Sequence, residues 1–277
     1  MEYIEILFEN LADDEKEFLI ALLADIGFEG FEEENKMLRA FIPFIEFEEK
    51  LLNKIVEIKN IKYSKSIIKY KNWNEIWESD FQPVLINYPN TDIPFVKILA
   101  HFHKPDPSFL FNISITPKMS FGTGHHETTH LMVAHMSEID FKEKSVIDFG
   151  TGTGILAILA EKLGASHVVA IDNDEWSIKN AIENVEVNNC SNIFLQHTET
   201  ILSNLKAQII LANINLNTIR QNINAIINAA DTDSILLFSG IMLHDEEKIL
   251  QLLQIAKLKV KAVYKKDNWL SVMATKT

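Results

Sequence analysis

Three glycines and a preceding carboxylate have the spacing of a ligand-binding loop. The segment 146–154, VIDFGTGTG, carries Asp148 and then Gly150, Gly152 and Gly154, between a strand pattern and a helix pattern. Glycines there let the backbone approach a ligand, and the following helix exposes unpaired N–H groups. The third glycine comes one residue earlier than in the dinucleotide fingerprint G-x-G-x-x-G. Because a carboxylate at Asp148 would repel a pyrophosphate but could accept hydrogen bonds from an ammonium group, the pattern favours a zwitterionic, phosphate-free cofactor.

A second carboxylate closes the next predicted strand, which ends in Ala170-Ile171-Asp172. An acidic residue about 20 positions after a glycine loop, at a strand end, accepts the hydroxyl hydrogens of a ribose 2′,3′-diol. Asp148, the glycines and Asp172 together resemble the AdoMet-binding signature of Rossmann-like methyltransferases. The alternative is a structural turn followed by an exposed aspartate, which would make the agreement in order and spacing a coincidence.

A polar side chain also ends a later predicted strand, in Leu211-Ala212-Asn213. In amino-directed methyltransferases a polar residue at this place lies where the methyl group departs. Asn213 could therefore accept a hydrogen bond from an amine nucleophile, which makes it the candidate catalytic residue. The chain lacks the Pro-Pro-aromatic sequence that many amino-methyltransferases carry next, and a helix-capping asparagine is the alternative interpretation.

A second motif, His126-Glu127-x-x-His130, matches the zincin pattern H-E-x-x-H. Two histidines four residues apart on a helix could chelate zinc, with Glu127 as a base. The longer metzincin pattern needs a glycine and a third histidine, and this chain has Val133 and Met136 at those places. We therefore expect no metal, and interpret the segment as a glycine-flanked loop that leads into a helix beside the cofactor.

Alternating strands and helices must position these residues. From about residue 93 onward the apolar pattern switches repeatedly between a strand period and a helix period, which is typical of a mostly parallel sheet with helices on both faces. The last two strand patterns, 261–268 and 269–277, predict an antiparallel hairpin at the sheet edge. Ligands bind at the carboxyl ends of the strands in such an α/β fold.

The first seventy residues follow a different pattern. Strand and helix periods alternate there in the order β-α-β-β-α-β, which predicts a small ferredoxin-like α+β domain over 1–70. Residues 71–92 break the pattern and are predicted to form a linker. Trp73, Trp77 and Phe81 recur every four residues within it, so a short amphipathic helix is expected there. The remaining range, 93–277, is the predicted α/β domain.

The overall composition limits the class of protein. The 277 residues include 26 basic and 39 acidic residues, a net charge of −13, and a single cysteine, Cys190. One cysteine excludes an intramolecular disulfide and a cysteine-based zinc site. A protein that grips nucleic acid through phosphates needs the opposite charge, so direct nucleic-acid binding is not expected. With no apolar run of about 18 residues and an acidic start, we expect a soluble cytoplasmic protein.

Taken together, these motifs resemble one family: PrmA, the methyltransferase of large-subunit ribosomal protein L11. FGTGHHETT at 121–129 matches that family's F-G-T-G-x-H-x-T-T, and IDFGTGTGILAI at 147–158 matches its AdoMet loop. AIDND at 170–174 matches its acidic strand end, and LANI at 211–214 matches its fourth-strand motif. The similarity spans the whole chain, and the F-G-T-G segment is distinctive of the family.

This resemblance implies a cofactor, a partner and a set of contacts. It implies a Rossmann-like AdoMet methyltransferase sheet over 93–277 and an N-terminal domain that recognises ribosomal protein L11. It implies AdoMet contacts at six residues: Thr128, Thr129, Gly150, Gly152, Asp172 and Asn213. The family's products are methylated lysine ε-amines and a methylated N-terminal α-amine. A methyltransferase of RNA or of a small molecule, and a non-catalytic AdoMet-binding protein, are the alternative functions.

Overall fold

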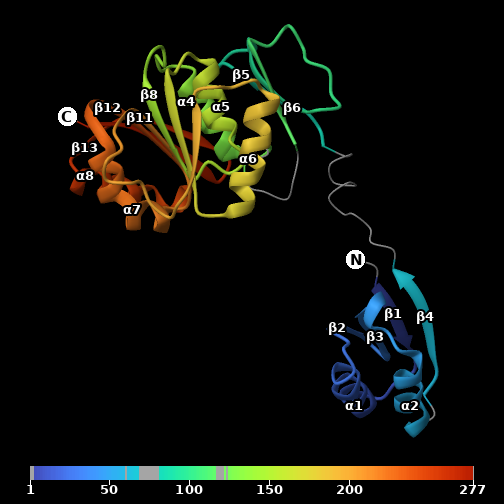
Figure 1. Cartoon of the computed structure of the whole chain (residues 1–277). Helices are drawn as coiled ribbons and strands as arrows, with labels where there is room; N and C mark the ends of the chain where they lie inside the picture. Colours follow the sequence, from blue (N-terminus) through green and yellow to red (C-terminus); the bar gives the residue numbers. More distant parts are fainter. Residues whose placement is uncertain (1–2, 60, 69–80, 117–121, 123, 277) are drawn as a thin grey trace. The chain divides into compact units, whose positions relative to one another are not determined.

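The chain folds into two compact units, Met1–Trp73 and Asn74–Thr277. The computed structural model describes residues 3–59, 61–68, 81–116, 122 and 124–276, and Figure 1 colours the chain from blue to red along the sequence. The helix expected around Trp73 and Trp77 lies outside the described residues. Among the described residues, no helix combines the length and the apolar character needed to cross a membrane.

The first unit has the predicted order of elements. Its helices and strands are β1 (Tyr3–Phe8), α1 (Asp13–Ala24), β2 (Gly30–Glu34), β3 (Met37–Pro43), η1 (Phe44–Glu46), α2 (Glu49–Lys59) and β4 (Tyr63–Ile68). The strands form one antiparallel sheet in the order β2-β3-β1-β4. The β2–β3 turn falls at Asn35, whose positive φ of 48° suits asparagine.

Alternation along β1 determines which face of this sheet is buried. Ile4, Ile6 and Phe8 are almost fully buried, whereas the residues between them are half-buried. The buried side chains join Leu19 and Leu23 of α1, with residues of α2, in one core. Because strand side chains alternate between faces, a one-residue change of register would expose all three of these apolar residues.

The second unit contains the remaining elements. They are β5 (Val84–Asn87), β6 (Pro94–Ala100), β7 (Phe111–Ile115), α4 (Glu127–Met136), β8 (Ser145–Phe149), α5 (Ile155–Lys162), β9 (His167–Asp172), α6 (Glu175–Val187), β10 (Ile193–His197), β11 (Ala207–Asn213), α7 (Leu216–Ala229), β12 (Ala230–Met242), η2 (Leu243–Asp245), α8 (Glu246–Ile255), β13 (Leu258–Lys266) and β14 (Trp269–Lys276). Seven strands form a sheet in the order β10-β9-β8-β11-β12-β14-β13.

The pairing within this sheet matches the predicted α/β fold. Strands β8 to β12 pair in parallel with one another, β14 pairs antiparallel with β12, and β13 pairs antiparallel with β14 at the sheet edge. From β8 the chain adds β9 and then β10 on one side, and from β11 it adds β12 on the other. The two directions diverge between β8 and β11, and open α/β sheets bind ligands at the carboxyl ends of strands at such a point.

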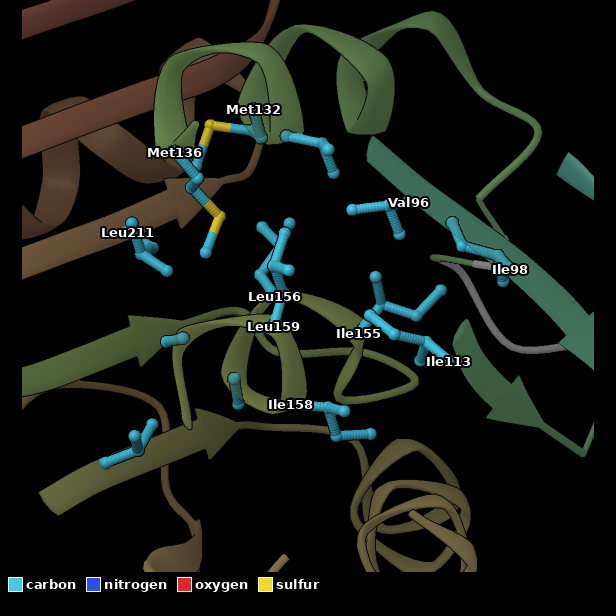
Figure 2. Packing of buried hydrophobic residues seen from close by; sticks show 14 of the residues in the cluster. Val96, Ile98, Ile113, Met132, Met136, Ile155, Leu156, Ile158, Leu159 and Leu211 are labelled. Carbon is cyan, nitrogen blue, oxygen red and sulfur yellow. The ribbon is translucent and has the colours of Figure 1, made fainter. Parts of the chain in front are cut away.

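Helices cover both faces of the sheet (Figure 1). On one face α4 packs over α5, and Met132 and Met136 point toward Leu156 and Leu159 (Figure 2). On the other face α7 and α8 pack through apolar residues such as Ile219 and Leu253, which are fully buried. Burial on both sides explains why the parallel strands are almost continuously apolar rather than alternating.

A separate three-stranded sheet, β5-β6-β7, lies in the second unit. β5 occupies residues 84–87, inside the range predicted as linker, and pairs antiparallel with β6. Phe81, just before it, is 3% exposed and belongs to the core of the second unit. Pro83 and Pro89 hid this strand from sequence analysis because proline usually interrupts sheets, yet both lie just outside the four paired residues.

A row of asparagines covers the outer edge of β7. Asn188 Oδ1 accepts the Ser114 N–H at 3.0 Å, and Asn188 Nδ2 donates to the Ser114 carbonyl at 2.6 Å. One turn earlier on α6, Asn184 Oδ1 accepts the Thr116 N–H at 2.8 Å. Side-chain amides thus complete backbone hydrogen bonds that a further strand would otherwise make.

Candidate functional site

Polar groups from several strand ends line one cavity of about 520 Å³. Gly150 and Gly152 follow β8, Asp172 ends β9, and Asn213 ends β11. The cavity is further lined by His126, Phe149, Asn173, Ser177, Thr198, Glu199, Ile214, Asn215, Thr218, Gly240 and Trp269. Its place at the divergence of strand order, and a volume within the usual range for small-molecule sites, make it the candidate active site.

The glycine loop forms a close-fitting wall of this cavity. Gly150, Gly152 and Gly154 have positive φ values of 79°, 54° and 84°. A Cβ added to Gly150 would lie 2.2 Å from Ile214 Cγ2, so a larger residue cannot be accommodated without movement. Gly154 caps α5 without a side chain, which leaves N–H groups of the first turn for other partners.

Asp172 connects the loop to the end of β9. Its Oδ2 accepts the Gly152 N–H at 2.8 Å, and its Oδ1 accepts the Asp174 N–H at 3.0 Å. Each carboxylate oxygen can accept a second hydrogen bond. The carboxylate lines the cavity and can take two hydroxyl hydrogens there while it holds the loop.

Asp148 lies beneath the loop, away from the cavity wall. It is fully buried, and its Oδ2 accepts the Thr151 hydroxyl at 2.6 Å and the Ala157 N–H at 3.2 Å. Burial raises the pKa of this carboxyl to about 7. The side chain braces the turn between β8 and α5 and is not among the residues that line the cavity, and its predicted contact with a ligand's ammonium group stays a prediction.

Asn213 presents an unsatisfied acceptor at the cavity wall. The side chain is 8% exposed, and its Oδ1 has no hydrogen-bond partner among the described residues. An unpaired buried carbonyl oxygen is unfavourable by about 1–3 kcal/mol, so a ligand that donates to it gains that difference. Helix capping, the alternative role, belongs to Asn215, whose Oδ1 accepts the Thr218 N–H at 3.0 Å.

Thr128 and Thr129 lie in the first turn of α4, and both are buried. The Thr128 hydroxyl lies 2.8 Å from His126 Nδ1, and Thr129 Oγ1 has no hydrogen-bond partner among the described residues. Neither threonine is among the residues that line the cavity. Their predicted contacts with AdoMet stay predictions.

The two histidines of the H-E-x-x-H pattern face different places. His126 is the N-cap of α4: its Nδ1 accepts the Thr128 N–H, and the ring lines the cavity edge-to-face with Trp269 at 4.6 Å. His130 instead lines a separate groove with Tyr88 and Tyr264. The described residues contain no group of three or more acidic, histidine or cysteine side chains arranged for a metal ion.

Sequence reasoning missed several residues of the cavity. Thr198 and Glu199 follow the carboxyl end of β10, so strand topology alone could have indicated them. Gly240 was visible as a glycine inside a strand pattern; it lies at an irregularity in the β12–β14 pairing and has a φ of 79°. Trp269 had no signal, because only the folded hairpin brings it against His126.

Comparison with known proteins agrees with this geometry. The family model described as ribosomal protein L11 methyltransferase (PrmA) matches residues 20–277. The chain belongs to the PrmA family. A ribosomal protein L11 methyltransferase from Chlorobaculum parvum is 39% identical, over 98% of this chain and 96% of the relative. Another from Porphyromonas gingivalis is 37% identical, over 94% and 90% of the two chains.

A solved structure supports PrmA membership independently. The crystal structure of a ribosomal protein L11 methylase from Lactobacillus delbrueckii subsp. bulgaricus is similar with a TM-score of 0.62 and 29% sequence identity. The similarity covers 70% of this chain and 99% of that structure. The expected family and the α/β methyltransferase fold are both confirmed.

Proposed function

We propose that this chain transfers methyl groups from AdoMet to ribosomal protein L11, on lysine ε-amines and the N-terminal α-amine. The observation that carries the proposal is the single cavity that brings together the glycine loop, Asp172 and Asn213 in a member of the PrmA family. The substrate is suggested by the relatives' names, and the choice of amines follows from the resemblance of the motifs to that family.

The cavity fits AdoMet and its acceptor amine in three respects. The carboxylate of Asp172 can accept the two ribose hydroxyl hydrogens, and the backbone at Gly150 and Gly152 permits close approach. Asn213 Oδ1 is a buried acceptor that needs a partner. When bound, AdoMet supplies a methyl group on a positively charged sulfur, which is already a good leaving group. Rate enhancement at such a site comes chiefly from positioning the nucleophile.

The acceptor amine must reach the site without its proton. A lysine with a pKa of about 10.4 requires about 4.6 kcal/mol to become neutral at pH 7, whereas an α-amine with a pKa near 7.7 requires about 1 kcal/mol. Transfer from water into a closed cavity disfavours the charged form and reduces that requirement. Asn213 Oδ1 then accepts a hydrogen bond from the neutral amine and directs its lone pair away from the amide.

Neither histidine of the 125–126 pair is well suited as a general base. His126 Nδ1 already accepts the Thr128 N–H, so the neutral ring carries its proton on Nε2 and has no remaining acceptor. His125 Nε2 lies 3.0 Å from the Gln82 carbonyl, and His125 is not among the residues that line the cavity.

We further propose that the first unit is a ferredoxin-like substrate-recognition domain. Its strand order, β2-β3-β1-β4, and its β-α-β-β-α-β sequence of elements support this. Residues 1–70 hold 9 basic and 16 acidic residues, a net charge of −7, which favours a basic partner such as a ribosomal protein over nucleic acid. Because the substrate is a ribosomal protein, we expect the reaction in the cytoplasm.

Two measurements test this function. Calorimetric titration should show that the purified protein binds AdoMet. Mass spectrometry should show methylated L11 after L11 is incubated with AdoMet and the purified protein. AdoMet binding without methylation of L11, but with methylation of RNA or of a small molecule, would replace the proposed substrate. Absence of AdoMet binding would reject the proposed activity altogether.

A further inference from the structure

A buried hydroxyl joins two segments that lie 31 residues apart in the sequence. Thr153, inside the glycine loop, is fully buried, and its Oγ1 donates a hydrogen bond of 2.6 Å to the Gly122 carbonyl. Water competes little for a donor in such a place, so the bond is worth more than one made on the surface. Neither Thr153 nor Gly122 lines the cavity itself.

The backbone of Thr153 is held from the opposite direction. Asn184 of α6 donates from Nδ2 to the Thr153 carbonyl at 2.8 Å, and its Oδ1 accepts the Thr116 N–H at 2.8 Å. Thr153 is thus connected to the chain on both sides of residues 117–121: through Asn184 to Thr116, and directly to Gly122. Asn184 holds the backbone of the glycine loop in place through the Thr153 carbonyl. The Thr153 hydroxyl is not used in that bond, so it can hold Gly122.

Gly122 packs directly against Thr153 in a backbone conformation that favours glycine. Gly122 has a φ of 99°, and a Cβ added to it would lie 3.1 Å from Thr153 Oγ1 and 3.5 Å from Thr153 N. Two residues later, a Cβ on Gly124 would lie 2.5 Å from Ile98 Cδ1. The segment then reaches His126, which lines the cavity against Trp269. Both the glycine loop and the start of α4 are therefore walls of one cavity.

We infer that Thr153 is a positioning residue that sets the separation between these two walls through its hydrogen bond to Gly122. The inference rests on the proposed AdoMet-dependent function. Thr153 does not line the cavity; it acts through Gly122 on His126, and through the loop backbone on Gly152. Without the hydroxyl, the start of α4 and the glycine loop lose their direct connection, and the cavity is no longer preorganised for AdoMet.

The test compares Thr153→Val with Thr153→Ser in the full-length protein. Valine keeps the shape and removes the donor, whereas serine keeps the donor. Calorimetry should show AdoMet binding weakened about tenfold in Thr153→Val, since a net hydrogen bond near 1.4 kcal/mol corresponds to that factor, and restored within about threefold in Thr153→Ser. Hydrogen exchange without ligand should be faster at the backbone amides of 122 and 124–126 in the valine variant only.

Ser234→Ala is the matched control. Ser234 is 2% exposed and its hydroxyl donates to the Ala207 carbonyl at 2.8 Å, so the variant loses the same kind of buried bond away from the cavity. It should lower the melting temperature as Thr153→Val does, without changing AdoMet affinity. If Thr153→Val does not fold, Thr153→Ala replaces it in the same comparison.

Two outcomes would overturn the inference. Wild-type AdoMet affinity in Thr153→Val would show that the bond does not shape the cavity. Equal loss of affinity in Ser234→Ala would show a general effect of stability. Failure of the wild-type protein to bind AdoMet is a distinct result, because it would reject the proposed function rather than the role of Thr153.

Discussion

Asp172 performs two tasks with one carboxylate, since it holds the Gly152 N–H and faces the cavity. We predict that Asp172→Ala weakens AdoMet binding more than any other single change in the cavity. Hydrogen bonds to a charged group contribute about 1.5–3 kcal/mol each, so at least a tenfold loss of affinity is expected. Calorimetric titration measures it, with Asp231→Ala, an exposed aspartate on β12, as the control. Unchanged affinity would place the ribose elsewhere.

Asn213 should behave differently because its unpaired amide oxygen is assigned to the amine. We predict that Asn213→Ala lowers kcat at least tenfold while the dissociation constant for AdoMet changes less than about threefold. Asn213→Asp gives a second comparison, since it keeps an acceptor at the same place and adds a charge. A variant in which kcat is unchanged and AdoMet binding is lost would make Asn213 a cofactor-binding residue only.

Spacing in the sequence was sufficient to place some residues in the cavity and not others. The structure brings Gly150, Gly152, Asp172 and Asn213 to one cavity because strand ends in a parallel sheet meet at one edge. Asp148 could not be placed from its position alone, because whether it faces the ligand or the Thr151 hydroxyl depends on a side-chain direction. Trp269 comes from an antiparallel hairpin that sequence patterns could assign only to the sheet edge.

Helix α4 carries a buried ionisable group that the proposed chemistry does not use. His135 is fully buried, its ring stacks on Tyr264 at 3.9 Å, and neither ring nitrogen has a hydrogen-bond partner among the described residues. Burial lowers the pKa of His135 from 6.5 to about 4. The neutral ring is therefore favoured by the fold: its contribution to stability is present above pH 6.5 and is lost as the pH falls toward 4.

We predict that His135→Phe makes the protein less sensitive to acid. Protonation of His135 on acidification from pH 7 to pH 5 should lower the free energy of unfolding of the wild type by about 2 kcal/mol. Phenylalanine does not titrate, and its ring can still stack on Tyr264. Burial of Asp148 acts in the opposite direction, since its raised pKa makes the fold less stable as the pH rises toward 7. Urea midpoints of the two proteins should therefore be compared at each pH. A difference that does not grow on acidification would contradict the prediction.

The elements were predictable where their period was long or repeated. From β8 to β12 every parallel strand except β10 is followed by a helix. β5 and β7 are only four and five residues long, and their pairing with β6 depends on tertiary contacts. Asn184 and Asn188 covering β7 could be recognised only in the folded chain, because asparagine in a helix more often faces solvent.

For the whole molecule, the division into two units predicts a separation of tasks. A chain beginning at Asn74 keeps Phe81 and β5, which belong to the second unit, whereas a start near residue 90 would remove them. We predict that the chain from Asn74 binds AdoMet with the affinity of the full-length protein. Its kcat/KM for L11 should fall at least a hundredfold, because every residue of the acidic first unit is gone.

Circular dichroism must show that this shortened chain is folded before the comparison is made. A folded chain that methylates L11 as efficiently as the full-length protein would mean that the first unit does not recognise the substrate. Loss of both folding and AdoMet binding would instead show that the second unit depends on the first for its stability, which contradicts the division of tasks.

The central claim is that the cavity at the ends of β8, β9 and β11 transfers methyl groups from AdoMet to ribosomal protein L11. The most direct measurement is mass spectrometry of purified L11 after incubation with AdoMet and either the wild-type protein or Asn213→Ala. We predict that the wild type adds methyl groups to lysine side chains and to the N-terminal amine, and that Asn213→Ala adds far fewer in the same time. Unmodified L11 in the presence of wild-type protein that binds AdoMet would contradict this account.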